Sequence, residues 1–372
     1  MEDDIPAGPL RRGWTTGACA TAAAKAAYQA LLTGGFPDPV QITLPGGTRP
    51  AFCLAHHALG ADSASAGVIK DAGDDPDVTH GALVSATVRH GEAGSGVRFR
   101  AGPGVGMVTR PGLPIPPGEP AINPVPRRMI AEAIAEVAAA HGGSGDAVVE
   151  IAIRDGAALA EKTLNPRLGI LGGLSVLGTT GVVIPYSCAA WIHSIHRGID
   201  VARAAGLDHV IASTGRSSEA AAQAFHGAPE VALIDMGDFA GATLKYLRRH
   251  PVATVTLAGG FAKMTKLGQG LMDLHSRRGE VDFAWLAGRL AAAGAGESLV
   301  AAARGANTAN EVLGWAAAAG LPLPALVAEA AWSSAAAMLA GSGMRLEVLV
   351  VDRQGRIVGH VPPRPVHDAP PR

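Results

Sequence analysis

The 372-residue sequence predicts an α+β domain over residues 1–155, a Rossmann-like α/β domain over residues 156–361, and a disordered tail over residues 362–372. Two observations predict this division. The first half contains short strand-like runs and few helices, whereas the second half alternates short apolar runs with helical stretches. Hydrophobic residues make up 48% of the chain, which is enough for two substantial cores.

The first domain is expected to open with a helix over residues 15–32. Thr15 or Thr16 can cap its start, and the glycine pair at 34–35 can end it. A second helix is expected over residues 126–140, where isoleucines and a valine recur at helical spacing. The strands expected in this half are residues 40–44, 51–55, 67–70, 82–88, 97–101 and 147–153.

In the second half, apolar runs and helical stretches follow one another in the order typical of parallel strands joined by crossover helices. Ala-rich helices are expected over roughly residues 261–340, before a closing pair of strands. The strands expected in this half are residues 210–213, 231–235, 252–257, 346–351 and 356–360, and the first helices between them are residues 217–225 and 239–249.

Composition excludes several classes of protein. The net charge of −1 and the 4% of aromatic residues argue against a nucleic-acid partner. Three cysteines without Cys-x-x-Cys spacing argue against a zinc or iron–sulfur site, and we interpret the helical pair His193 and His196 as packing or surface histidines without a third ligand. Residues 168–192 carry no charge, but their five glycines are unsuited to a membrane helix, so we expect a cytoplasmic protein with no membrane partner.

The run from Lys70 to Gly81 contains four aspartates within seven residues. Carboxylates this close repel one another, so they must be solvated or must face cations. Gly73 and Pro76 predict a loop between two strands. An EF-hand is excluded because the twelfth position from Asp71 is Ala82 rather than glutamate. A solvated acidic turn and a functional loop both fit the pattern.

This acidic run resembles the acidic motif of the CbiD family of cobalt-precorrin-5B C1-methyltransferases in anaerobic cobalamin biosynthesis. Further stretches resemble the same family in the same order from about residue 10 to residue 320. They are Arg12 to Ala20, Gly118 to Arg127, Leu164 to Pro185, Ser213 to Arg216, Asp235 to Phe239, the region around His275 to Arg277, and Ala306 to Asn310.

The resemblance implies a CbiD-like two-domain architecture and methylation of C1 of cobalt-precorrin-5B by S-adenosylmethionine, giving cobalt-precorrin-6A. It also implies a cobalt-tetrapyrrole partner and no protein-bound metal, since the substrate carries the cobalt. Homo-oligomerisation and transient contacts with neighbouring pathway enzymes stay open. A non-catalytic carrier that holds an unstable tetrapyrrole for the next enzyme is the alternative function.

Candidate site residues follow from the chemistry of these motifs. Carboxylates of the acidic loop could orient the donor or move a proton; the candidates are Asp74, Asp75 and Asp77. A helix N-terminus and basic side chains could bind the substrate's carboxylates, and the candidates are Thr15, Thr16, Lys25, Arg110, Arg127 and Arg216. Glycine-rich turns and polar strand ends could bind the donor, and the candidates are Gly178, Thr179, Thr180, Thr214, Gly215, Asp235 and Asp238. An ordinary capped helix, solvated arginines, close backbone packing and helix capping by Asp238 are the structural alternatives.

Overall fold

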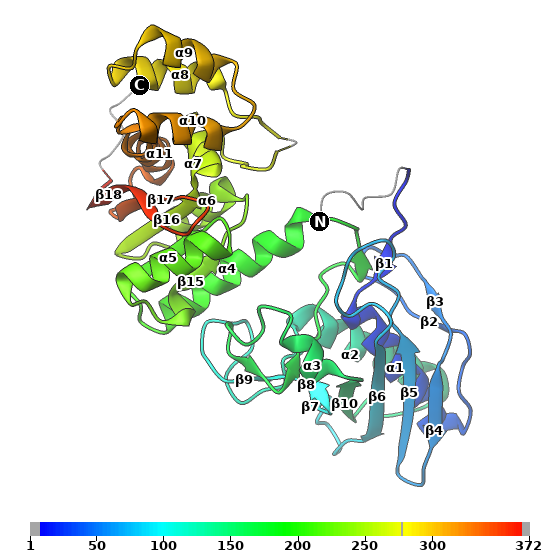
Figure 1. Cartoon of the computed structure of the whole chain (residues 1–372). Helices are drawn as coiled ribbons and strands as arrows, with labels where there is room; N and C mark the ends of the chain where they lie inside the picture. The colour runs from blue at the N-terminus through cyan, green and yellow to red at the C-terminus, as the bar shows by residue number, and fades with distance from the viewer. Residues whose placement is uncertain (1–7, 277, 367–372) are drawn as a thin grey trace. The chain divides into compact units, whose positions relative to one another are not determined.

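The computed structural model describes residues 8–276 and 278–366. The chain forms two compact units, Met1–Cys188 and Ala189–Arg372, and both combine helices with strands (Figure 1). Among the described residues, no helix combines the length and apolar character needed to cross a membrane. Each unit has its own sheet and its own main hydrophobic core.

The first unit is built on a five-stranded sheet in the order β4-β5-β6-β10-β7. Its neighbouring strands are antiparallel except for the parallel pair β10 and β7. In β10, buried and half-exposed residues alternate, so the apolar side chains line one face. The bounds are β4 His56–Leu59, β5 Ser63–Ile69, β6 Leu83–His90, β7 Val97–Ala101 and β10 Ala147–Ile153, with the small pair β2 Val40–Gln41 and β3 Ala51–Phe52 beside them.

Two long helices cover this sheet, α1 (Thr16–Thr33) and α2 (Pro124–His141). Helix α1 contacts β5, β6 and α2, and it is buried on almost every side because its many alanines allow close approach. The Thr15 side chain caps its start, and Gly34 ends it in the left-handed conformation with φ 79°. The α+β layer expected for the first half is therefore confirmed.

The boundary between the units differs from the expected one at residues 155/156. Residues 156–188 belong to the first unit because they pair with its earlier segments, up to about 170 positions away. This stretch begins with helix α3 (Gly156–Ala160). Its strands then pair with earlier ones: β11 Ile170–Leu171 with β9 Met107–Val108, β12 Gly173–Leu174 with β8 Gly104–Val105, and β13 Val182–Val183 with β1 Gly13–Trp14. Pairs this short and this distant leave no periodic pattern in the sequence.

The second unit contains a five-stranded sheet in the order β15-β14-β16-β17-β18. The first four strands are parallel, and β18 is an antiparallel edge strand. The strands are β14 His209–Ser213, β15 Leu233–Asp235, β16 Thr254–Gly260, β17 Arg345–Val351 and β18 Ile357–Pro365. The helices are α4 Cys188–Ala204, α5 Arg216–His226, α6 Ala240–Arg249, α7 Phe261–Gly268, α8 Phe283–Ala292, α9 Glu297–Arg304, α10 Ala309–Ala318 and α11 Leu323–Leu339, with a 3₁₀ turn at Glu230–Ala232.

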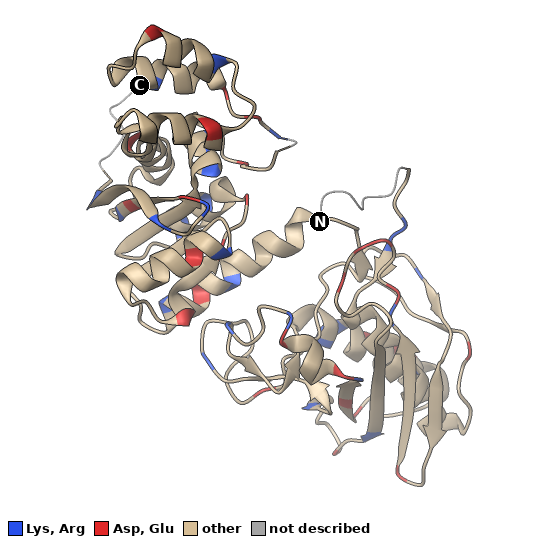
Figure 2. Ribbon diagram, in the orientation of Figure 1, with Lys and Arg blue, Asp and Glu red and all other residues tan. Residues whose placement is uncertain are grey.

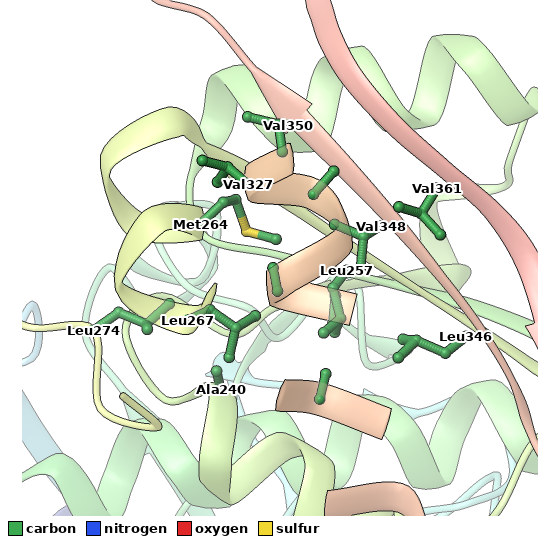
Figure 3. Packing of buried hydrophobic residues seen from close by; sticks show 14 of the residues in the cluster. Ala240, Leu257, Met264, Leu267, Leu274, Val327, Leu346, Val348, Val350 and Val361 are labelled. Carbon is green, nitrogen blue, oxygen red and sulfur yellow. The ribbon is translucent and has the colours of Figure 1, made fainter. Parts of the chain in front are cut away.

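The two faces of this sheet are packed unequally. Helices including α4, α6, α7 and α11 contribute to a large core on one face, where Leu257, Met264 and Val348 meet (Figure 3). Helix α5 covers the other face over a small cluster of buried residues: Ile211, Ala222, Leu233, Ala258 and Leu349. The alternation of strands and helices expected for the second half thus begins after residue 188.

The expected disordered tail begins too early. Residues 362–365 form the end of β18, whereas residues 367–372 lie outside the described residues. Prolines are compatible with this strand because it lies at the edge of the sheet and need not donate every ladder hydrogen bond.

Candidate active site

The acidic loop joins β5 to β6 in the first unit, and its first aspartate is held by Arg11. The Arg11 guanidinium donates to both carboxylate oxygens of Asp71, and the Gly73 amide donates to Oδ1 at 2.9 Å. These bonds lower the pKa of Asp71 to about 2, the Arg11 side chain being the largest cause. Gly73 is required here, since a Cβ would lie 2.1 Å from the Arg11 carbonyl oxygen. In Figure 2 the loop is a red stretch with blue segments beside it.

Asp77 is paired with a lysine that has almost no contact with solvent. The Lys70 ammonium donates to Asp77 Oδ2 at 2.6 Å, and its side chain is only 1% exposed. Thr79 donates to Oδ1 through its amide and its hydroxyl, at 2.8 and 2.6 Å. Burial alone would raise the pKa of Asp77, but the Lys70 charge and these hydrogen bonds hold it below its usual value. Asp77 therefore has a structural role in keeping Lys70 compensated.

Asp74 and Asp75 each bind a backbone amide of a distant segment. Asp74 Oδ2 accepts from the Arg11 amide at 2.6 Å, and Asp75 Oδ1 accepts from the Tyr186 amide at 2.8 Å. Tyr186 has a positive φ of 56°, an uncommon conformation that the bond to Asp75 helps to hold. One oxygen of each carboxylate is committed to the fold, and the other could face a ligand.

The N-terminus of α1 lies against the segment that contains Gly178. A Cβ on Gly178 would come within 2.2 Å of Thr15 Oγ1, so glycine permits this contact. The Gly17 amide donates to the Leu177 carbonyl at 2.9 Å, and the amide of Ala18 donates to Thr15 Oγ1 at 3.2 Å. These donors are not directed outward, and Thr15 and Thr16 are buried. The structure therefore has an ordinary capped helix at this position and does not support the carboxylate site expected there.

Three segments of the first unit meet around this helix start. The Trp14 amide donates to the Asp71 carbonyl, and the Thr15 amide donates to the Gly181 carbonyl. The exposed Thr179 and Thr180 lie in the third segment, where Thr180 Oγ1 accepts from the Val182 amide at 3.3 Å. The acidic loop and the glycine-rich turn predicted from sequence are thus brought together.

Two of the predicted basic ligands are already engaged. Lys25 is buried, donates to the Gln41 carbonyl at 2.8 Å and pairs with Glu136 at 2.9 Å. Arg127 donates to the Ile122 carbonyl at 2.8 Å, and it also bonds Glu119 and the backbone at Pro120. Each cation therefore has internal partners that fix its position, and a role of either as a substrate ligand stays a prediction.

Arg110 remains available in the first unit. Its side chain is exposed, its aliphatic stem lies against Gly169, and among the described residues its guanidinium has no hydrogen bond or ion pair. It can therefore meet a carboxylate without first breaking an internal contact.

In the second unit, a pocket of about 340 Å³ lies at the carboxyl ends of β14, β16 and β17. Its size is within the range of small-molecule sites. Three of the predicted ligand residues line it, namely Thr214, Gly215 and Arg216. The other lining residues are Ser217, Ser218, Gly260, Phe261, Ala262, Lys263, Asn310, Val351, Asp352 and Arg353.

Two helices begin at this pocket, α5 after Gly215 and α7 after Gly260. Neither helix has a side-chain cap. Gly260 has φ −64° and Gly215 has an extended backbone, both of which any residue can adopt, and a Cβ at either position would meet no protein atom within 4 Å. Neither glycine is therefore required by the protein's own packing, and the space above both is open to a ligand.

The pocket has a basic lining. Lys263 donates to the Thr214 carbonyl at 2.9 Å and lies 3.0 Å from Asp238 Oδ1, while Arg216 and Arg353 add two further cations. Asp352 is neutralised by Arg356; burial alone would raise the pKa of Asp352, but hydrogen bonds from Arg356 lower it. The arrangement favours an anionic group.

The two aspartates predicted to bind the donor lie outside the pocket lining. Asp238 reaches it through Lys263, and Asp235 ends β15, where Trp191 donates to its carbonyl at 3.1 Å. Sequence reasoning missed Lys263, Asn310 and Arg353 as lining residues. Arg353 could have been found, since it follows β17. The closing pair expected for that strand is confirmed by β18, but its parallel pairing with β16 was not foreseen.

Known families and proteins resemble this chain over both units. The family model described as CbiD matches residues 4–185, and the model described as CbiD, C-terminal domain, matches residues 273–362. The cobalt-precorrin-5B C(1)-methyltransferase of Bradyrhizobium sp. is 65% identical over 94% of this chain and 93% of its own. Its counterpart in Agrobacterium fabrum is 61% identical over 97% and 96%.

A solved structure, the cobalamin biosynthesis protein (cbiD) from Archaeoglobus fulgidus, is 27% identical, covers 73% of this chain and 84% of that chain, and has a TM-score of 0.40. From the family models and the relatives' near-complete coverage, the chain belongs to the CbiD family.

Proposed function

We propose that this chain is a cobalt-precorrin-5B C(1)-methyltransferase that transfers a methyl group from S-adenosylmethionine to C1 of its substrate, giving cobalt-precorrin-6A. The observation that carries the proposal is identity of 56–65% to relatives of that name over 94–97% of the chain. A non-catalytic carrier is not favoured, because these relatives are named as enzymes. A cytoplasmic location, homo-oligomerisation and contacts with pathway enzymes are finer parts of the proposal.

The reaction requires little covalent chemistry from the protein, because the methyl group passes directly from the donor to the substrate. The ring carbon attacks the sulfonium methyl group in line with the departing sulfur, whose positive charge is neutralised as the transition state forms. Water around the sulfonium would oppose this step. The protein acts mainly by aligning carbon, methyl and sulfur and by excluding solvent.

The pocket of the second unit is the proposed donor site. The sheet order, numbered along the chain, is 2-1-3-4-5, which is an order of doubly wound sheets whose switch point lies between strands 1 and 3. These strands are β14 and β16. Gly215, just after β14, and Gly260, the last residue of β16, both line the pocket. We also propose, as part of this assignment, that the second unit is a Rossmann-like domain.

The charge of the pocket suits the carboxylate of the donor's methionine part. Amides at two helix N-termini and the cations Arg216, Lys263 and Arg353 surround the space. Thr214 and Gly215 are the proposed donor contacts, and Asp238 acts by positioning Lys263.

On the substrate side, Arg110 is the proposed partner of a peripheral carboxylate, since its guanidinium has no internal contact among the described residues. Arg216, predicted from sequence as a substrate ligand, lines the donor pocket and is proposed to bind the donor's carboxylate instead. Asp74 and Asp75 retain a proposed role in moving a proton through their second oxygens. The exposed Thr179 and Thr180 of the first unit are the donor contacts to test if the pocket of the second unit does not bind the donor.

Calorimetric titration with S-adenosylhomocysteine, with and without a cobalt-tetrapyrrole analogue, tests the proposal. We expect saturable binding by the natural chain in at least one condition. The variant Gly260→Val fills the pocket and should abolish this binding. Gly296→Val is the matched control, because Gly296 also precedes a helix with φ −64° and open space but does not line the pocket.

The outcomes separate the activity from its location. Absence of binding by folded natural protein in both conditions would count against the methyltransferase. Undiminished binding by Gly260→Val would keep the activity but move the donor site elsewhere. Equal loss in both variants would indicate an effect on helix starts in general.

A further inference from the structure

A buried carboxylate in the second unit is surrounded by histidines. Glu347 lies in β17 with a side chain that is 1% exposed. Its Oε1 lies 2.8 Å from His360 Nε2, and its Oε2 lies 2.7 Å from His226 Nε2 and accepts a hydrogen bond from Thr256. Among the described residues, no lysine or arginine pairs with this carboxylate. An ionised carboxylate buried this deeply requires a compensating positive charge.

A third histidine, His209, approaches the same point from β14. His209 Nε2 lies 2.7 Å from Thr256 Oγ1, and the rings of His209 and His226 stand perpendicular with centroids 4.7 Å apart. One ligand atom each of His209, His226 and Glu347 lies within 4.8 Å of the other two.

The contact between His226 and Glu347 is close but not a normal hydrogen bond. His226 Nε2 is buried and, although 2.7 Å from the carboxylate, lies outside hydrogen-bonding geometry. The nitrogen is therefore near the oxygen without being directed at it. Such a close approach without a hydrogen bond is the arrangement of two ligand atoms that both point toward a third atom between them.

The donor set matches a known kind of metal site. Two imidazoles and one carboxylate bind zinc in a tetrahedral arrangement with a fourth ligand, at metal–ligand distances of about 2.0–2.2 Å. A tetrahedral ion of this size holds its ligand atoms about 3.3 Å apart. The His226 and Glu347 ligand atoms are 2.7 Å apart and all three ligand atoms lie within 4.8 Å of one another, so small side-chain movements are sufficient to reach this spacing.

We propose that His209, His226 and Glu347 bind a divalent transition-metal ion of the zinc type. His360 orients the carboxylate through Oε1, as partners outside the ligand set commonly do. This proposal departs from the expectation of no protein-bound metal. That expectation came from the family resemblance, in which the substrate carries the cobalt, and from the cysteine spacing and the lack of a third ligand for His193 and His196.

The position of the cluster gives the ion a structural role. His209 begins β14, and Glu347 is the third residue of β17, so the cluster lies toward the amino ends of the parallel strands. The pocket lies at the opposite, carboxyl ends. His226 is the last residue of α5, which otherwise packs on a small apolar cluster. A metal here fastens the end of α5 to β14 and β17.

Titration of chelator-treated full-length protein with Zn²⁺ by calorimetry tests the proposal. We expect saturable binding of one ion per chain and a rise in the unfolding temperature on zinc addition. Co²⁺ in place of zinc should give the intense visible absorption of a tetrahedral site. Neither readout uses the methylation reaction, so the result is independent of the proposed function.

Three glutamine variants probe the ligands and a control. His226→Gln and His209→Gln should each weaken Zn²⁺ binding at least tenfold and abolish the cobalt spectrum. His193→Gln, on α4, should leave Zn²⁺ binding and the cobalt spectrum unchanged. The nearby His196 on the same helix has a packing contact, since its ring stacks on that of Tyr246 with centroids 3.9 Å apart. Circular dichroism establishes that each variant is folded. If one ligand variant does not fold, the other still tests the site.

The proposal is overturned if the folded natural chain shows no saturable binding of Zn²⁺. It is equally overturned if both ligand variants bind like the natural chain, or if His193→Gln loses binding to the same extent. In those cases the cluster is a network of polar contacts around Glu347 that holds no metal.

Discussion

Replacing Asp77 by asparagine tests whether this carboxylate serves the fold or the reaction. The change removes one charge and keeps an oxygen that can accept from Thr79. It leaves the Lys70 ammonium, whose side chain is 1% exposed, without an ionised partner. Removing one member of a buried ion pair destabilises a protein by about 3–5 kcal/mol. Because the Asp77 side chain is 24% exposed and water can reach the site, we expect the lower end, about 3 kcal/mol.

This loss corresponds to a fall of about 6–12 °C in the unfolding temperature for a cooperative unit of this size. Differential scanning calorimetry and urea denaturation measure it. The pKa of Asp77 is lowered in the fold, because the Lys70 charge and hydrogen bonds outweigh the effect of burial. Its contribution is therefore present above the ordinary pKa of 3.8 and is lost as the pH falls through the lower folded value. The difference between variant and natural chain should shrink in acid.

Two further variants serve as controls. Lys70→Met combined with Asp77→Asn removes both charges and should recover much of the lost stability, since no buried charge is then left without a partner. Asp75→Asn disturbs one hydrogen bond, from the Tyr186 amide, and should cost about 1 kcal/mol. The reasoning would be refuted if Asp77→Asn unfolded within about 1 °C of the natural chain. A loss of turnover in that stable variant would assign Asp77 to catalysis instead.

Three other predictions concern stability and reactivity. Arg11 lowers the pKa of Asp71 to about 2, so this ion pair should stabilise the fold above pH 3.8 and lose its effect as the pH falls toward 2. The unfolding temperatures of Asp71→Asn and the natural chain should therefore become equal near pH 2. Gly288→Ala should raise the free energy of unfolding by about 0.5–1 kcal/mol in urea denaturation, because Gly288 is exposed inside α8 and a Cβ meets nothing within 4 Å. Burial raises the pKa of Cys19 to about 12, so iodoacetamide and mass spectrometry on native protein should show alkylation of the two exposed cysteines and none of Cys19.

Local patterns in the sequence determined many of the elements. The strand over residues 147–153 has the expected bounds, and α2 spans 124–141 where residues 126–140 were expected. Periodic apolar residues and the glycines that end helices act over a few positions, so they can be recognised along the chain. The succession of family motifs likewise needed no coordinates, and it identified the CbiD family correctly.

The use of the charged residues was decided only by the tertiary structure. Lys25 and Arg127 resemble free substrate ligands in the sequence, yet their partners lie on neighbouring elements. Arg110 and Arg216 have the same residue type and lack such partners among the described residues. Whether a cation is engaged depends on its three-dimensional neighbours, which sequence spacing does not specify.

The division into units, the pocket and the histidine cluster also depend on contacts between distant positions. Residues 156–188 join the first unit through strand pairs with much earlier segments. The pocket and the histidine cluster lie at opposite ends of the parallel strands of one sheet. Strand β17 contributes to both, and β14 carries His209 and leads into Thr214 of the pocket. The sequence alone determined the family, most of the regular elements and the glycine-rich strand end at Gly215. Folding decided which side chains meet, because the free energy of burying a charge depends on the partners that the tertiary structure brings to it.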